Sequence, residues 1–279
     1  MPGSAWPPSF DCHAPAVPPQ VTCDALRDSF KEGGRVLPGM LRSRGIDITQ
    51  VSDVFVGSFS AGHGVMKGAG GILANDADRA LVRVVTLADS TYTSWLDQAK
   101  RIPNPPDAYA KYAMDCLTSD RLFIATCSNH QAGIFPSGQE TVRALVKEIE
   151  KRSGRKFTVT GAGAPISGFG DTALRLPPVF AGVTPAPKTL YSLGNVLFAD
   201  YDMTVPHGEH ASKLMPQVWR NIVIPWWTAA PAPPGPSPVG PPVDEQPEDS
   251  GPGTVAKVFA FLGGAAAGYA GVRAWRRRS

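Results

Sequence analysis

The stretch Val54-Phe55-Val56-Gly57-Ser58-Phe59-Ser60-Ala61-Gly62-His63-Gly64 is the part of the chain from which the fold can be predicted. An apolar run ends abruptly at small residues around Ser60, which is typical of a strand that turns sharply into a helix. Such a turn exposes the serine hydroxyl and directs the first N–H groups of the helix toward a reaction centre. Ser60 is therefore a candidate nucleophile. The simpler interpretation is a serine in a tight glycine turn, with no chemistry.

Strands and helices are predicted to alternate along the rest of the chain. We expect further strands over 81–88, 121–127 and 189–201, and helices over about 61–73, 106–117, 138–153 and 216–223. This alternation predicts an α/β fold with a parallel sheet, a reduced three-layer core. Ligands bind beyond the carboxyl ends of the strands in such sheets. Chemically useful side chains follow the predicted strands at Ser60, Asp89, Ser128–His130, His207 and His210.

Composition divides the chain into four parts. We expect a proline-rich arm over 1–21, an α/β domain over 22–228, a proline-rich linker over 229–254 and a hydrophobic helix with a basic tail over 255–279. The domain is long enough to bury a sizeable core. The proline-rich linker would be extended and semi-rigid.

The last part of the chain predicts a membrane-associated helix. Its uncharged core, 258–272, is shorter than the roughly 20 residues that a membrane span needs, but snorkelling of Lys257 and Arg273 would extend it. Glycines along 255–275 suit helix–helix association. The orientation stays open, and the alternative is a partner-binding tail on a soluble cytoplasmic protein.

Charge and cysteine usage argue against several classes of function. The net charge is +3, and the body of the chain has no basic run interleaved with aromatic residues, so we expect no nucleic-acid partner. The cysteines form no C-x-x-C pair, and the HxxH at 207–210 has no evident third ligand, so neither a metal nor a cofactor is expected. Cys127, inside an apolar run, is expected to be a buried thiol.

The order of the polar residues is the order of a serine hydrolase. A nucleophilic serine needs a base, and the base needs an acid to orient it. Here the serine comes first, then an acid, then histidines. The segments SFSAG, LADSTYTSW, CSNHQAGIFPSG and DYDMTVPHGEHASKLMPQVW resemble the α/β-hydrolase superfamily. The resemblance covers roughly residues 24–227.

The resemblance implies roles for particular residues. Ser60 would be the nucleophile, Asp89 the acid and His210 the base, with the N–H of Ala61 as one oxyanion donor. His210 is preferred to His207 because it stands six residues before Pro216, which is expected to open the last helix. The alternative base is His207, and the alternative acids are Asp202 and Asp200. Tyr92 and Trp95, together with Phe135, are candidate substrate contacts.

The chain departs from the superfamily pattern at two places. Ser58 occupies the position of the first glycine in the G-x-S-x-G turn, and few strands can precede Val54, although the loop after an earlier strand usually supplies the second oxyanion donor. We expect a serine hydrolase that cleaves a small-molecule or envelope ester or a related acyl bond. The alternative is a non-catalytic binding or assembly module of the same fold, anchored by its C-terminal helix.

Overall fold

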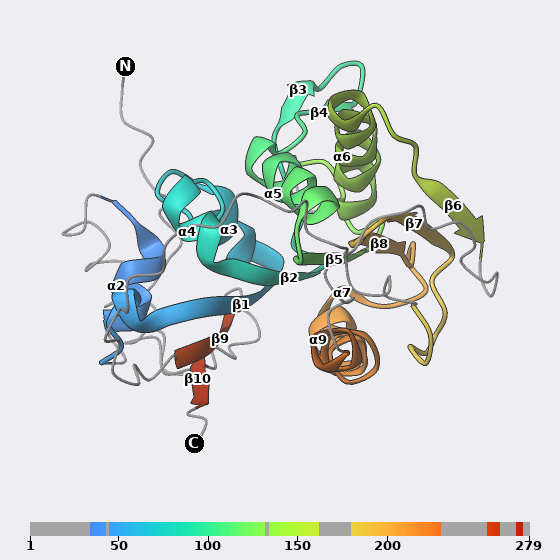
Figure 1. Ribbon diagram of the computed structural model, residues 1–279. Helices are drawn as coiled ribbons and strands as arrows, with labels where there is room; N and C mark the ends of the chain where they lie inside the picture. Colours follow the sequence, from blue (N-terminus) through green and yellow to red (C-terminus); the bar gives the residue numbers. More distant parts are fainter. Residues whose placement is uncertain are drawn as a thin grey trace, which may run out of the picture.

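An eight-stranded, mostly parallel sheet forms the centre of the protein (Figure 1). The computed structural model describes residues 34–42, 45–131, 134–161 and 180–229, and the backbone of 256–262 and 272–275. The sheet has the order β10-β9-β1-β2-β5-β8-β7-β6. Its strands are β1 Val51–Phe59, β2 Val82–Ala88, β5 Leu122–Cys127, β6 Thr158–Gly161, β7 Thr189–Leu193, β8 Val196–Asp200, β9 Ala256–Leu262 and β10 Val272–Trp275.

The parallel part of the sheet brings four strand ends to one edge. β9, β1, β2, β5 and β8 run parallel, whereas β10, β7 and β6 pair antiparallel with their neighbours. Register places Phe59 beside Ala88, and Cys127 beside Asp200. The residues that follow β1, β2, β5 and β8 therefore meet at the carboxyl edge, as the sequence predicts.

Helices cover both faces of the sheet. On one face lie α2 Val36–Arg42, α3 His63–Lys67, α4 Asp76–Leu81, α5 Asp107–Thr118 and α6 Gly138–Ser153. On the other lies one continuous helical segment, made of α7 His207–Glu209, a wider turn at His210–Leu214, α8 Met215–Val218, a second wider turn at Trp219–Val223 and α9 Ile224–Thr228. Each layer buries its own apolar core against the sheet, so the α/β prediction is confirmed.

Local signals in the sequence account for the most regular helix. Ser137 and Glu140 form the predicted capping box of α6, and Gly154 ends the helix with a φ of 68°. The predicted stripe of α6 is buried: Val142, Leu145, Val146 and Ile149. A small two-stranded sheet, β3 Trp95–Asp97 and β4 Ile102–Pro103, leads into α5.

Three predicted elements have different boundaries. The strand expected over 189–201 is a hairpin, because Gly194 adopts a φ of 55° and turns β7 back onto β8. The helix expected over 61–73 ends at Lys67, because the chain turns at Gly70, where a Cβ would lie 1.6 Å from the Gly34 carbonyl oxygen. The last helix begins at His207 rather than near Pro216.

The C-terminal segment differs most from the prediction. A helix was expected over 255–279, but Ala256–Leu262 and Val272–Trp275 are strands, and β9 pairs with the free side of β1. A short apolar run suits a buried strand as well as a helix, so periodicity alone could not separate the two. Within the described part of the chain, no helix has the length and apolar character to cross a bilayer.

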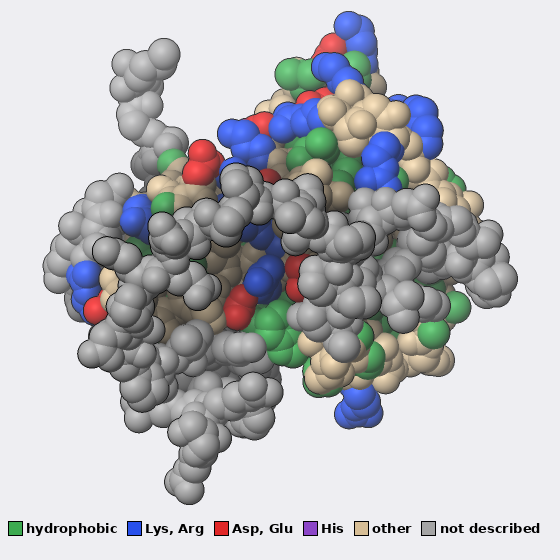
Figure 2. Space-filling model, viewed as in Figure 1, with side chains coloured by type: hydrophobic (Ala, Val, Ile, Leu, Met, Phe, Trp, Pro, Cys, Tyr) green, Lys and Arg blue, Asp and Glu red, His purple; other side chains and the backbone are tan. Residues whose placement is uncertain are grey.

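Other expectations concern charge, cysteines and the arm. Basic and acidic side chains are interspersed over the region of α5 and α6 (Figure 2), where Arg152 pairs with both Asp107 and Glu148. Cys127 is a buried free thiol, as predicted, and so is Cys116. The arm over 1–21 and nearly all of the linker over 229–254 lie outside the described residues.

Candidate active site

Ser60 lies at the sharp turn that the sequence predicts. β1 ends at Phe59, and a short helical turn over Ser60–Gly62 leads directly into α3. Ser60 has a φ of 51°, in the left-handed region that side chains rarely adopt. Such strain is concentrated at functional sites. The side chain is partly exposed, and within the described residues its Oγ has no hydrogen-bond partner.

Two buried serines support this turn. The Ser58 hydroxyl donates to Ser90 Oγ over 2.8 Å, and the Ser90 hydroxyl donates to the Ser60 carbonyl oxygen over 2.9 Å. Ser58 therefore contributes to holding the Ser60 backbone. The sequence pattern alone gave no reason for a serine at this position, and the contact with Ser90 supplies one.

Asp89 follows β2, beside the Ser60 turn, and is fully buried. Its Oδ1 accepts the Ser128 N–H over 3.0 Å, and its Oδ2 accepts the Ser128 hydroxyl. Burial alone would raise the pKa of Asp89, but its hydrogen bonds with His207 and Ser128 and the nearby His210 together lower it. Asp89 is therefore ionised at neutral pH.

His207 contacts this carboxylate directly. His207 Nδ1 lies 2.8 Å from Asp89 Oδ2. Because an ionised carboxylate only accepts, Nδ1 carries the proton and Nε2 is left as the basic nitrogen. The ring packs on Phe59, the residue before Ser60, with centroids 4.7 Å apart, and stacks on His130 at 5.2 Å.

His210, the preferred base at the sequence level, is in a different position. It is fully buried, and its Nδ1 lies 2.9 Å from Thr126 Oγ1 rather than at the Asp89 carboxylate. Burial lowers its pKa, so it is neutral. The preference for His210 assumed a helix that opens at Pro216. The helix opens after Pro206 instead, so His207 occupies its first turn and His210 points into the core one turn later.

The alternative acids have other partners. Asp202 Oδ2 pairs with Lys188 Nζ at 2.8 Å, and Asp200 Oδ2 accepts from Gln139 Nε2 at 2.6 Å. Asp200 Oδ1 also accepts the N–H of Asp202 over 2.8 Å. Asp202 and Asp200 therefore stabilise the loop after β8 and its contact with α6. Of the three candidate acids, Asp89 is the one whose carboxylate contacts a histidine ring.

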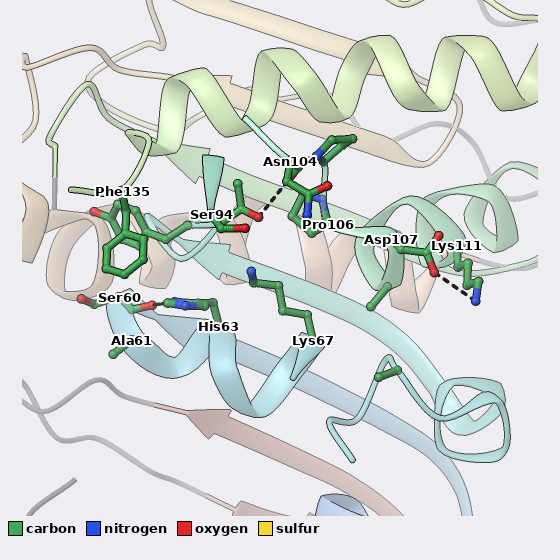
Figure 3. A pocket seen from close by; sticks show the side chains of 15 residues that line it. Ser60, Ala61, His63, Lys67, Ser94, Asn104, Pro106, Asp107, Lys111 and Phe135 are labelled. Carbon is green, nitrogen blue, oxygen red and sulfur yellow. Dashed lines mark hydrogen bonds and ion pairs between the residues drawn. The ribbon is translucent and has the colours of Figure 1, made fainter. Parts of the chain in front are cut away.

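A cavity of about 740 Å³ opens beside Ser60 (Figure 3). The Ser60 turn and α3 line one part of the cavity, and residues 92–94 with residues of the 104–111 segment line another. Tyr92 joins the cavity to the acid–base pair, because its hydroxyl lies 3.5 Å from Asp89 Oδ2 and 3.4 Å from His207 Nδ1. Ala61 and Phe135 also line the cavity.

Trp95, a predicted substrate contact, does not line this cavity. Its indole N–H donates to the Ile134 carbonyl oxygen over 2.5 Å, and the Arg101 guanidinium lies 5.2 Å from its ring centroid. Trp95 instead ties the β3–β4 hairpin to the loop before α6. Of the three predicted contacts, Tyr92 and Phe135 line the cavity and Trp95 does not.

Sequence reasoning missed three residues of the site. Gly138, the first residue of α6, lets the helix approach Asp89, because a Cβ there would lie 2.6 Å from Asp89 Oδ1. His63 and Lys67 line the cavity from α3. Their three- and seven-residue spacing from Ser60 places them on its helix face and was the available signal.

Comparison of the chain with protein-family models, curated proteins and solved structures finds no match. In the described ranges, no three His, Cys, Asp or Glu side chains gather as a metal site would require. The chemistry of the site is therefore inferred from its geometry.

Proposed function

We propose that the protein is a serine hydrolase of the α/β-hydrolase type that cleaves an ester or a related acyl bond through Ser60, His207 and Asp89. One observation carries the proposal: a buried aspartate holds His207 Nδ1 at 2.8 Å, beside a serine with a strained, positive φ. The aspartate fixes the imidazole tautomer, and the strain directs the serine toward a cavity.

The proposed reaction begins with attack of Ser60 Oγ on the substrate carbonyl carbon. His207 Nε2 takes the hydroxyl proton, while Asp89 stabilises the resulting imidazolium. The N–H of Ala61, at the start of the helical turn, has no partner within the helix and would donate to the developing oxyanion.

Collapse of the tetrahedral intermediate completes the first half of the reaction. His207 returns its proton to the leaving alcohol, and the acyl group stays on Ser60. Water then attacks the acyl carbon as His207 takes a proton from it, and the carboxylic acid leaves with Ser60 restored. The hydrogen bond from Ser60 Oγ to His207 Nε2 would form when substrate binds, since catalytic hydrogen bonds of this kind are often completed only in the substrate complex.

A covalent probe tests this proposal. A fluorophosphonate should label the folded protein, and Ser60→Ala should abolish labelling. Ser94→Ala, which removes another hydroxyl from the cavity wall, should leave labelling in place. If the folded, unmodified protein is not labelled, Ser60 is not an activated nucleophile.

That negative result would favour a non-catalytic binding module. The observation on its side is the Ser60 hydroxyl, which has no hydrogen-bond partner in the described part of the chain.

A further inference from the structure

The cavity beside Ser60 has a charged end. Ser60, His63 and Lys67 share one face of the turn and helix that follow β1 (Figure 3). At about 1.5 Å of rise per residue, Lys67 begins roughly 10 Å along the helix from Ser60. Its side chain extends into the cavity across from Ser94 and Asn104 (Figure 3).

Lys67 has no acidic partner within the described residues. Among the other described lysines, five are in ion pairs at 3.0 Å or less (Lys100, Lys111, Lys156, Lys188 and Lys213), and Lys147 and Lys151 are on the surface. These are largely exposed, whereas Lys67 is mostly buried, and burial lowers its pKa to about 8. An ammonium group taken out of water without a counter-charge is costly, so its place in a cavity points to an anion supplied by a ligand.

The other titratable side chains near Lys67 are either paired or neutral, so Lys67 is the group that would bind an anion. Asp107 also lines the cavity, but its carboxylate is held by Lys111 at 3.0 Å and by Arg152 at 2.9 Å. Burial and the Lys67 charge lower the pKa of His63 to about 4, so His63 is neutral at pH 7. Among the described residues that line the cavity, Lys67 is therefore the one cation without an acidic partner.

The cavity lining also has apolar side chains, and the His63 ring adds a hydrogen-bond acceptor. The apolar residues include Ala74, Pro105, Pro106 and Phe135. His63 Nδ1 lies 3.0 Å from the Ser60 carbonyl oxygen, which can only accept, so Nδ1 carries the proton and Nε2 is the acceptor.

We propose that the substrate is an ester with a carboxylate or phosphate group at the end of a short apolar spacer, and that Lys67 binds this anionic group. The proposal rests on the serine hydrolase function and names its substrate class. The apolar side chains hold the spacer, while Lys67 fixes the distance from the anion to the scissile carbonyl at Ser60.

Paired ester substrates test the proposal in the full-length protein. We would compare 4-nitrophenyl monoesters of dicarboxylic acids, from succinate to suberate, with neutral alkanoate esters of equal length, and add an ω-phosphorylated series. A charge-assisted hydrogen bond is markedly stronger than a neutral one, so kcat/KM should favour an anionic ester at least tenfold. The better of the two anionic series identifies carboxylate or phosphate as the natural group.

Substitutions at Lys67 test whether this residue causes the preference for anionic esters. Lys67→Met should lower the ratio of kcat/KM for the anionic ester to kcat/KM for the neutral ester to about one, while Lys67→Arg should keep most of the preference. Hydrolysis of the neutral and anionic esters at equal kcat/KM by the unmodified protein would overturn the proposal and leave the hydrolase function standing.

A binding measurement separates the two proposals. Ser60→Ala should bind monomethyl suberate at least tenfold more tightly than methyl octanoate in calorimetry, and adding Lys67→Met should remove the difference. If neither ester series is hydrolysed but this difference is observed, the hydrolase function fails and the anion site stands. Equal binding of the two ligands would overturn the anion site.

Discussion

At the scale of single residues, the site depends on backbone positions that are strained or closely approached. Ser60 has a φ of 51°, and Asp89 has a φ of 43°. Both follow directly after parallel strands, so the strain directs two side chains out of the carboxyl edge of the sheet. The sheet and its covering helices must hold these conformations, because an isolated chain would avoid them.

The Ser60 strain predicts a gain in stability on substitution by glycine. Glycine adopts a positive φ without steric cost, so Ser60→Gly should raise the free energy of unfolding by about 1 kcal/mol, while removing the nucleophile. Ser60→Ala also removes the nucleophile but keeps the strain, and serves as the control. Urea denaturation measures both, and a glycine variant less stable than the alanine variant would contradict the expected strain.

The close approach of Gly138 to Asp89 predicts that a larger side chain at position 138 lowers activity, although it removes none of the proposed catalytic groups. In Gly138→Ala the new Cβ would lie 2.6 Å from Asp89 Oδ1, so the carboxylate must move and its bond to His207 weaken. We expect the rate of fluorophosphonate labelling to fall at least tenfold. Gly64→Ala, where the Cβ meets open space, is the control and should keep the rate. Equal rates in the two variants would mean that the position of Asp89 is not critical.

If Lys67 binds the anionic group, the preference for an anionic over a neutral ester should depend on pH. A lysine is charged below its pKa, so the preference for an anionic ester should be full at pH 6–7 and should be lost as pH rises through about 8, the lowered pKa of Lys67. His63 is already neutral in this range, and Asp107 and Lys111 remain paired with each other. The ratio of kcat/KM for the anionic and neutral esters is the measurement, because a pH effect on the chemical step is common to both esters and cancels in the ratio.

Lys67→Arg provides the control for this pH dependence. A guanidinium stays charged throughout, so the preference should persist above pH 9 in this variant. A preference of the unmodified protein that does not change between pH 6 and 10 would exclude Lys67 as its source.

At the scale of elements, the start of one helix decides which histidine can act as a base. The helical segment begins after Pro206, which puts His207 in the first turn at the edge of the sheet and His210 in the core beside Thr126. A helix that began near Pro216 would have left both histidines in a loop. The choice between them is therefore a property of the helix boundary, which sequence patterns locate poorly.

The two histidines should respond differently to the same substitution. His207→Gln removes the proposed general base and should lower kcat by about 10²–10⁴, with little change in stability. His210→Gln should keep kcat within a few-fold but lower the free energy of unfolding by about 1–3 kcal/mol, because it disturbs a buried polar contact. Ester hydrolysis and urea denaturation of both variants check this, and the opposite pattern would restore His210 as the base.

At the scale of the whole molecule, a strand from the C-terminal segment pairs with the first strand of the sheet. β9, from the C-terminal segment, pairs along β1 from Val51 to Ser58, so the strand that carries Ser60 has a neighbour on each side. Without β9, β1 would become an exposed edge, and exposed apolar edges promote aggregation.

Removal of residues 255–279 should therefore destabilise the domain. We expect a lower urea midpoint and a higher tendency to aggregate than in the full chain. Ala260→Pro, which removes a ladder donor in β9, should act in the same direction, and Ala260→Val should not. If truncation instead leaves the urea midpoint unchanged and removes membrane association, the segment is the membrane helix that its composition suggests.

The sequence by itself determined the features that depend on neighbouring residues. The strand-to-helix turn at Ser60, the acid at the end of the next strand and the capping box of α6 are local patterns, and each is found where the sequence predicts it. Strand–helix alternation then implied the parallel sheet, because parallel strands need crossover connections.

Only the tertiary structure decided what depends on contacts between distant segments. The pairing of His207 with Asp89 joins residues 118 positions apart, and Lys67 lies in a cavity that residues 92–94 and residues of the 104–111 segment also line. The apolar segment at 256–262 became a strand because β1 offered it a free edge. Local propensity cannot specify such partners, since the free energy that selects them comes from burial and hydrogen bonding across the whole fold.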